Sequence, residues 1–172
     1  LAFIAPALLF ALWAEATPRQ AIALGWWFGV GQFGVGVTWV FVAINDFSAT
    51  PVAIGVLLTA LFVSVLALYP ALAGYLATKL TERFSLQHES AMLLLFPAIW
   101  VAVEWLRGWF LSGFPWLLLG QSQLDTPLVA LAPLGDIFAI SLAVALTAAL
   151  LAWLIFNGVR SLRVVMLLLL LP

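Results

Sequence analysis

The chain has 172 residues, of which 66% are hydrophobic and only 8% are charged, with a formal net charge of −1 and no cysteine. Soluble domains are about 45–50% apolar and about 25% charged, so this chain has too few charged side chains to cover a globule in water. The composition therefore predicts a membrane protein. It excludes a water-soluble enzyme, a nucleic-acid-binding protein, a disordered chain and, within these residues, any thiolate site.

Six apolar runs, separated by polar residues, proline and glycine, predict an all-α fold: a polytopic bundle of membrane helices. The runs cover residues 1–14, 22–44, 51–77, 91–111, 128–156 and 164–172. A bilayer core about 30 Å thick needs roughly 20 helical residues to cross. The first and last runs are shorter than this, so we expect the chain to be a fragment of a longer protein, cut within a helix at each end.

Basic residues fall on alternate loops between these helices, and this pattern predicts the orientation of the chain. The basic loop residues are Arg19, Lys79, Arg83, Arg160 and Arg163. The loops 45–50 and 112–127 contain none. We therefore expect the loops that carry basic residues to face the cytoplasm and the other two to face the outside.

The helix expected at 22–44 is rich in glycine. Its segment Gly29–Gly34 matches the dinucleotide-binding pattern G-x-G-x-x-G, but it lies inside an apolar helix with no preceding strand, so the match is accidental. Packing is the better interpretation, because glycine lets membrane helices approach closely. We expect this role for Gly25, Gly29, Gly31, Gly34 and Gly36, of which the first two form a G-x-x-x-G pair.

Glu104 and Arg107 are charged residues inside the helix expected at 91–111. Because they are three positions apart, they share one helix face. Charges within a membrane span are costly and usually face each other or a cavity. Two interpretations stay open. One is a structural ion pair near the outer end, with Arg107 extending towards headgroups. The other is a site for a phospholipid headgroup or for an attached catalytic domain.

The external segment 112–127 begins with an apolar stretch that is interrupted by Gly113, Pro115 and Gly120. This stretch is too short to cross the membrane, which predicts a re-entrant or interfacial loop. Non-helical backbone at that depth must be buried in protein or line a wet cavity. The polar residues 121–123 would satisfy such backbone or touch a substrate. A plain surface loop anchored by Trp116 is the alternative.

No constellation of residues indicates metal binding or nucleophilic catalysis. The single histidine, His88, lies beside Glu89 in a loop expected on the cytoplasmic side, away from the polar external loops. We therefore expect no metal site, no cofactor and no Ser-His-Asp set in these residues.

The ordered string Glu104–Trp116, followed by Gly120–Gln123, resembles apolipoprotein N-acyltransferase of Gram-negative bacteria. The stretch Gly34–Val42 is similar to the third membrane helix of that family, and Leu131–Gly135 fits the segment after its Gln-Ser-Gln motif. The resemblance covers about residues 25–158.

The resemblance implies a bacterial inner-membrane enzyme of eight helices, with a periplasmic nitrilase-like α/β domain downstream that these residues lack. It implies transfer of an acyl chain from a phospholipid donor to the N-terminal cysteine amino group of a diacylated apolipoprotein. In that family the chain passes through a thioester on a catalytic cysteine, assisted by Glu and Lys. Those residues belong to the nitrilase-like domain, so no catalytic residue is assigned here. The implied partners are both substrates and the lipid bilayer.

In this interpretation the helices form a platform, and external loops 45–50 and 112–127 are periplasmic. A set of residues on that side would contact the substrates or the catalytic domain. The candidates are Arg107 and Glu104 near the lipid phosphate, Phe114, Pro115 and Trp116 along the acyl path, and Gln121 and Gln123 against the catalytic domain.

Two other functions stay open from the sequence. Broken helices and charges within the membrane suit a small-molecule transporter, although these charges lie near helix ends and no internal repeat is apparent. The second alternative is a non-catalytic membrane scaffold, or a family member fused to a different enzyme such as a polyprenol-phosphate mannosyl transferase. The presence of a downstream nitrilase-like domain would favour the acyltransferase.

Overall fold

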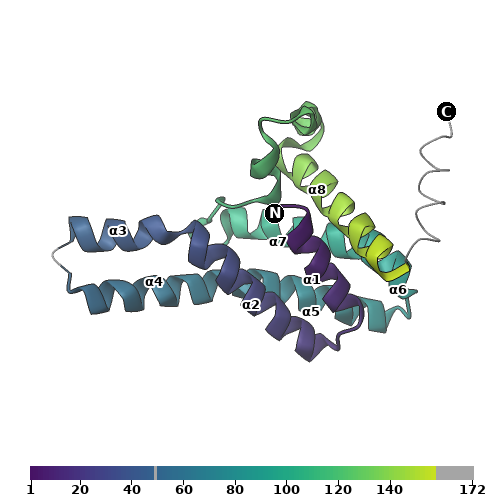
Figure 1. Ribbon diagram of the computed structural model, residues 1–172, viewed down its shortest axis with the longest axis horizontal. Helices are drawn as coiled ribbons and strands as arrows, with labels where there is room; N and C mark the ends of the chain where they lie inside the picture. Colours follow the sequence, from purple (N-terminus) through teal and green to yellow (C-terminus); the bar gives the residue numbers. More distant parts are fainter. Residues whose placement is uncertain (49, 158–172) are drawn as a thin grey trace.

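The computed structural model describes residues 1–48 and 50–157, so the helix expected at 164–172 lies outside the described residues. The helices are α1 (Ile4–Ala14), α2 (Pro18–Gly36), α3 (Thr38–Phe47), α4 (Val52–Leu66), α5 (Leu68–Arg83), α6 (His88–Ser90), the π-helical turn η1 (Ala91–Leu95), α7 (Phe96–Trp109) and α8 (Ala132–Asn157). The 3₁₀ turns η2 (Phe110–Ser112), η3 (Leu119–Gln123) and η4 (Pro127–Leu131) connect α7 to α8. The described ranges contain no strand, which confirms the predicted all-α fold class (Figure 1).

Among the described residues, three helical stretches are long and apolar enough to cross a membrane: Val52–Arg83, His88–Trp109 and Pro127–Ile155. A fourth is formed if α2 and α3, which meet at a bend of 50°, are counted as one broken span. The chain therefore has the architecture of a multi-pass membrane protein.

The single helix expected at 22–44 is divided into α2 and α3. The backbone leaves the helical region at Val37, where φ is −116° and ψ is 22°. Gly34 and Gly36 lie directly before this break, and glycine has low helix propensity. The bend redirects α3 away from the axis of α2.

Helix α2 also begins before its predicted start, for a local reason. Thr17 and Gln20 form a capping box, in which each side chain bonds the backbone N–H of the other residue, and Pro18 occupies the first helical position. A hydropathy pattern marks only the apolar part of a helix, so it misses this polar first turn.

The helices form one bundle with a projecting hairpin. Helix α2 packs most extensively on α5, α1 packs on α8, and α7 packs on both α5 and α8. Helix α4 packs on α3 and α2, and the α3–α4 hairpin projects from the bundle at the left of Figure 1. None of the residues of α3 is buried. Helix α3 therefore carries little of the packing that holds the bundle together, whereas Val63 and Leu66 of α4 pack with Phe33 in a second buried cluster.

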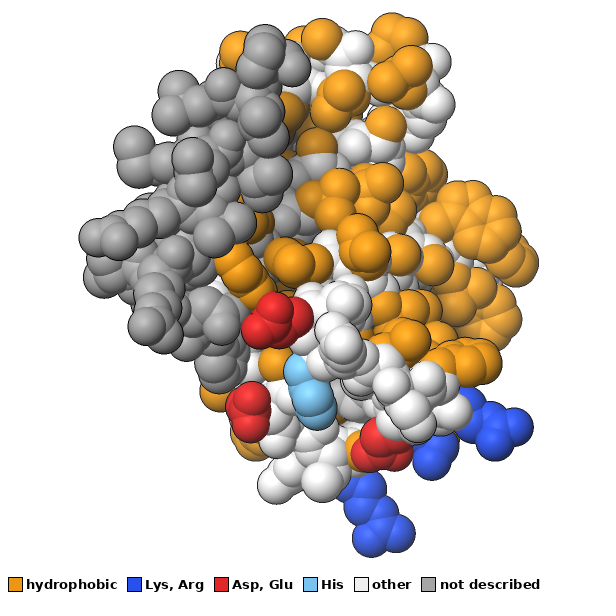
Figure 2. Space-filling model, turned by 90° about the vertical axis from the view of Figure 1, so that its right-hand side faces the viewer, with side chains coloured by type: hydrophobic (Ala, Val, Ile, Leu, Met, Phe, Trp, Pro, Cys, Tyr) orange, Lys and Arg blue, Asp and Glu red, His pale blue; other side chains and the backbone are white. Residues whose placement is uncertain are grey.

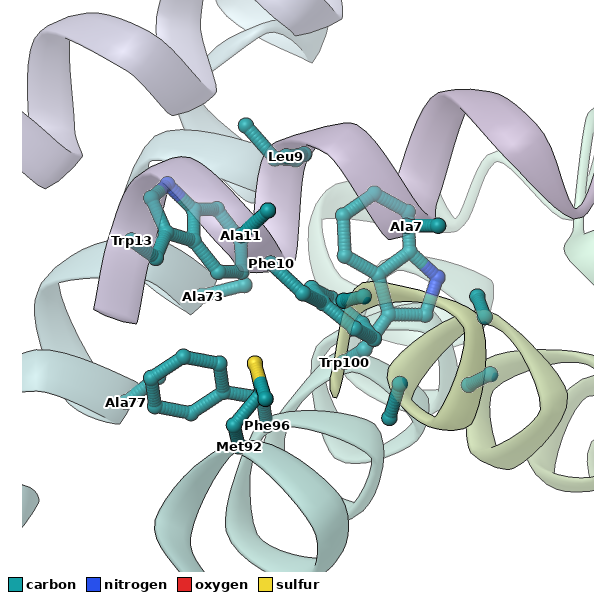
Figure 3. Close-up of a cluster of buried hydrophobic side chains, with 14 of the residues drawn as sticks. Ala7, Leu9, Phe10, Ala11, Trp13, Ala73, Ala77, Met92, Phe96 and Trp100 are labelled. Carbon is teal, nitrogen blue, oxygen red and sulfur yellow. The ribbon is translucent and has the colours of Figure 1, made fainter. Parts of the chain in front are cut away.

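Aromatic rings join α1 to α7 in the main core (Figure 3). Phe10 and Trp13 of α1 face Phe96 and Trp100 of α7, with ring centroids 6.0 to 6.2 Å apart. Helix α8 adds small, fully buried side chains, namely Val144, Ala145, Ala148, Ala149 and Ala152. Because lipid tails are as apolar as these side chains, close packing rather than the hydrophobic effect stabilises such a core.

Gly25 and Gly29 lie where α2 meets α5. A Cβ atom on Gly25 would lie 2.8 Å from the Cα of Ala71, and one on Gly29 would lie 2.7 Å from the Cα of Ala67. These contacts involve the backbone of α5 and of Ala67, the residue directly before it, and backbone cannot turn aside as a flexible side chain can. The two helices therefore approach this closely only with glycine at both positions.

The other three glycines of this stretch have different surroundings. A Cβ atom on Gly36 would overlap the side chain of Leu117, which lies in the segment between α7 and α8. One on Gly31 or Gly34 would meet nothing within 4 Å. Within the described residues, Gly31 and Gly34 therefore make no close approach to another helix, and the packing role expected for them stays a prediction.

Charged side chains gather at the end of the bundle opposite the hairpin. Figure 2 shows Lys, Arg, Asp, Glu and His side chains together at the lower end of the face drawn, below a hydrophobic surface. Arg19, Lys79, Arg83 and His88 are exposed and lie near the turns that follow α1 and α5. The described charged residues are therefore concentrated at this end of the bundle, whereas the neighbouring surface is apolar.

Candidate functional site

The segment between α7 and α8 has an irregular backbone. Helix α7 ends close to Gly113, which has a φ of +79°, a region that favours glycine. The N–H of Phe114 donates back to the carbonyl of Arg107 at 2.8 Å. Leu111 and Leu117 also have positive φ, 52° and 58°, which is uncommon for leucine. Such a backbone persists only where its surroundings hold it, so the side chains around the segment form the candidate site.

Arg107 points into the protein beneath the segment. It is only 3% exposed, and its Nη1 donates to the carbonyl oxygens of Phe114 (2.9 Å) and Trp116 (2.6 Å). Its guanidinium carbon lies 5.1 Å from the centre of the Phe33 ring, a cation–π contact. The interpretation in which Arg107 extends towards headgroups is therefore wrong, because its guanidinium binds backbone carbonyls inside the protein.

The carboxylate of Glu104 accepts a hydrogen bond from the same segment. It is 4% exposed, and its Oε1 accepts from the indole N–H of Trp100 (3.0 Å) and from the backbone N–H of Leu119 (2.9 Å). The described residues show no direct ion pair between Glu104 and Arg107, although their opposite charges attract. The predicted ion pair is therefore corrected: each charge binds a different part of the segment's backbone.

Gln32 of α2 and Ser141 of α8 bind the segment from two further helices. Gln32 Nε2 donates to the carbonyl of Leu117 at 3.1 Å, and Ser141 Oγ accepts from the N–H of Gly120 at 2.8 Å. A Cβ atom on Gly120 would lie 2.5 Å from the carbonyl oxygen of Ile137. The sequence predictions missed Gln32 and Ser141. The available signal was a polar side chain within the apolar part of a membrane helix.

The four residues Gln32, Glu104, Arg107 and Ser141 are called the polar frame below. They come from α2, α7 and α8, and they bind backbone groups between Phe114 and Gly120. Lipid offers no hydrogen bonds to exposed backbone, so an irregular segment at membrane depth needs partners of this kind.

Gln121 and Gln123 belong to the segment, and their side-chain amides form hydrogen bonds with other residues of it. Gln121 Oε1 accepts from the N–H of Leu118 at 3.1 Å, and its Nε2 donates to the carbonyl of Pro115 at 2.8 Å. Gln123 is 7% exposed, and its Nε2 donates to Ser122 Oγ at 2.9 Å. Both amides therefore stabilise the local turn, and the buried Gln123 is not presented to a neighbouring domain.

Phe114, Pro115 and Trp116 have different environments. Phe114 is half-buried, with its ring 5.3 Å from the ring of Phe62. Pro115 is exposed, and Trp116 is 51% exposed with its ring 6.3 Å from that of Trp39. Of the three residues expected along an acyl path, only Pro115 and Trp116 are therefore placed to meet lipid from outside.

An apolar cavity of about 690 Å³ opens beside the segment, between α1 and α2. Phe28 of α2 and residues Leu117–Leu119 contribute apolar lining, while Gln121 and Ser122 add polar groups. Its volume is within the range of about 300–1,000 Å³ that is typical of ligand sites. Phe114–Trp116 do not line this cavity, so the acyl path predicted along them is a different surface.

His88 has a local structural contact. Its Nδ1 lies 3.0 Å from the carbonyl oxygen of Ala14, which connects the end of α1 to α6. In the described ranges, no three His, Cys, Asp or Glu side chains come together as a metal site would require.

The fold and the polar frame define a class of protein: a multi-pass helical membrane domain that holds an irregular segment between two of its helices. The sequence model of a protein family, the apolipoprotein N-acyltransferase N-terminal domain, matches residues 1–150 of this chain. The chain belongs to the apolipoprotein N-acyltransferase family.

Several curated relatives carry that name. The chain is 48% identical over 159 residues to the apolipoprotein N-acyltransferase of Methylococcus capsulatus, a match that covers 90% of this chain and 31% of the relative. The protein of Vibrio parahaemolyticus is 41% identical over 153 residues, covering 89% and 30%, and that of Coxiella burnetii is 46% identical over 147 residues, covering 84% and 30%. The chain therefore spans about 30% of the length of these relatives.

Proposed function

We propose that this chain is the membrane domain of an enzyme that transfers an acyl chain from a phospholipid to the N-terminal amino group of a diacylated apolipoprotein. The family match over residues 1–150 carries the proposal. The nucleophilic cysteine and its Glu and Lys partners would lie in the part of the relatives that this chain does not span. The described helices would anchor that part in the bacterial inner membrane.

The segment bound by the polar frame is the proposed contact surface for the lipid substrates. Trp116 is half-exposed, and a tryptophan ring with an apolar body and one N–H suits the interface between lipid and water. The neighbouring 690 Å³ cavity is lined mainly by apolar side chains, as an acyl chain requires. Arg107 and Glu104 would act from beneath by fixing the backbone that carries Trp116, and a direct phosphate contact is not proposed for them.

The enzyme activity is tested with the protein in its full natural length. It is incubated with phospholipid and a diacylated lipopeptide, and mass spectrometry measures the added N-acyl chain. We expect an acylated product. Trp116→Ala should lower the initial rate by about tenfold, equivalent to about 1.4 kcal/mol, because the lipid loses an interfacial contact.

Trp105→Ala is the matched control for that experiment. Trp105 is 54% exposed, close to the value for Trp116, but it belongs to α7, where its ring packs 5.4 Å from that of Trp109. Its variant should react at the wild-type rate. Equal losses in both variants would contradict a specific role for the segment. The absence of any acylated product from well-folded protein would contradict the enzyme assignment and would lead to transport assays.

The orientation is proposed from the alternation of basic loops, with residues 45–50 and 112–127 periplasmic and the loops after α1 and α5 cytoplasmic. Alkaline phosphatase, which is active only outside the cytoplasm, can be fused after Thr50 or after Arg83. We expect activity from the Thr50 fusion and little from the Arg83 fusion. The reverse result would invert the proposed orientation.

A further inference from the structure

A small cavity of about 10 Å³ lies beneath the external segment, where α2, α5 and α7 meet. Its polar lining consists of Gln32, Tyr69, Glu104 and Arg107. The other lining residues are Phe33, Pro70, Ala73, Trp100 and Val103. A space of about this volume holds one water molecule and nothing larger.

Two buried acceptor atoms belong to residues that line this cavity and have no hydrogen-bond partner in the described residues: Oε1 of Gln32 and Oε2 of Glu104. Leaving a buried acceptor unpaired is costly, and native proteins rarely do so. The hydroxyl of Ser141 lies near the Glu104 carboxylate, but it does not form a hydrogen bond with Oε2 in this structure. Each oxygen therefore still needs a donor.

The orientation of the Gln32 amide follows from its other contact. Its Nε2 lies 3.1 Å from the carbonyl oxygen of Leu117, and a carbonyl oxygen can only accept. The NH₂ group must therefore face Leu117, which leaves Oε1 without that partner. In the same way, Glu104 Oε1 is already occupied by the N–H groups of Trp100 and Leu119, so Oε2 is the free acceptor.

We propose that one water molecule occupies this cavity and donates its two hydrogens to Gln32 Oε1 and Glu104 Oε2. Water has two donors for these two acceptors, and its lone pairs can accept from the guanidinium of Arg107, which has five N–H donors. A metal cation suits the cavity less well, because the Arg107 charge would repel it. Internal waters of this kind typically make about three hydrogen bonds to otherwise unpaired polar groups.

This water would complete the polar frame. It would connect α2 to α7 and bridge Glu104 and Arg107, which form no direct ion pair in the described residues. Both ends of the bridge bind backbone of the external segment, Gln32 at Leu117 and Glu104 at Leu119. The water site therefore contributes to the shape of the segment.

The test is an experimental structure of the full natural-length protein in lipid, at a resolution that shows ordered water. We expect one ordered density peak within about 2.7–3.2 Å of both Gln32 Oε1 and Glu104 Oε2. No peak there, or a protein donor bonded directly to each oxygen, would overturn the proposal.

A pair of variants provides a second test by the same measurement. Gln32→Leu removes one of the two acceptors, so the water peak should be lost. Gln123→Leu makes the same change at another buried glutamine, whose amide bonds Ser122 and does not line the cavity, so the peak should remain. A peak that persists unchanged in Gln32→Leu would overturn the assigned hydrogen bonds. If Gln32→Leu does not fold, the wild-type structure still decides between the outcomes.

Discussion

Replacing Arg107 with alanine should lower the free energy of unfolding by about 3–5 kcal/mol, the range expected when a buried charge is left without the opposite charge that compensates it. Two carbonyl oxygens, those of Phe114 and Trp116, would lose their donor. Glu104 would remain as a buried charge without the nearby cation. The measurement is unfolding of the full natural-length protein in lipid nanodiscs, followed by tryptophan fluorescence.

Two further arginine variants separate charge from geometry. Arg107→Lys keeps the charge but lacks the planar guanidinium that reaches two carbonyls and stacks on Phe33, so we expect an intermediate loss. Arg83→Ala changes an exposed arginine at the charged end of the bundle and should alter stability by no more than about 0.5 kcal/mol. If Arg107→Ala were as stable as wild type, the segment would not depend on this side chain.

Gly25→Ala should destabilise the bundle by about 1–3 kcal/mol, which is the usual cost of overpacking a tight core. The added methyl carbon would lie 2.7 Å from the carbonyl carbon of Pro70 and 2.8 Å from the Cα of Ala71. Both atoms belong to the backbone of α5, so α2 and α5 must separate. Unfolding in nanodiscs measures the effect, and the acyl-transfer rate shows whether the separation reaches the external segment.

Gly34→Ala is the matched control on the same helix. A Cβ atom there meets nothing within 4 Å, so the substitution should stabilise α2 by up to about 1 kcal/mol through higher helix propensity. The two substitutions are chemically identical, and their predicted effects have opposite signs. A stabilising Gly25→Ala would show that α2 and α5 do not approach as closely as the structure indicates.

Several features of the fold were predictable from the sequence because they depend on residues acting one by one. The free energy of moving a side chain into lipid adds up along the chain regardless of its partners, so hydropathy identifies the membrane class and the apolar stretches. The interruption at Gly113, Pro115 and Gly120 likewise marked the irregular segment. The ordered string from Glu104 to Trp116 was sufficient to indicate the family, which the comparisons confirm.

The direction of each polar side chain was decided by the tertiary structure. Glu104 and Arg107 share a helix face, and spacing alone suggests that they bind each other. In the structure each binds a different part of the segment, because that backbone is folded over them and lacks other partners. Gln121 and Gln123 were expected to hold the loop against the catalytic domain, and the structure adds that their amides bond within their own turn.

By itself, the sequence determined the membrane class and the family of this protein. Only the tertiary structure distinguished Gly25, which touches α5, from Gly34, which does not, and brought Gln32 to Leu117 across 85 positions of the chain. The physical reason is that transfer into lipid is a property of single residues. Close packing and hydrogen bonding are properties of pairs, and these pairs form only when distant helices meet.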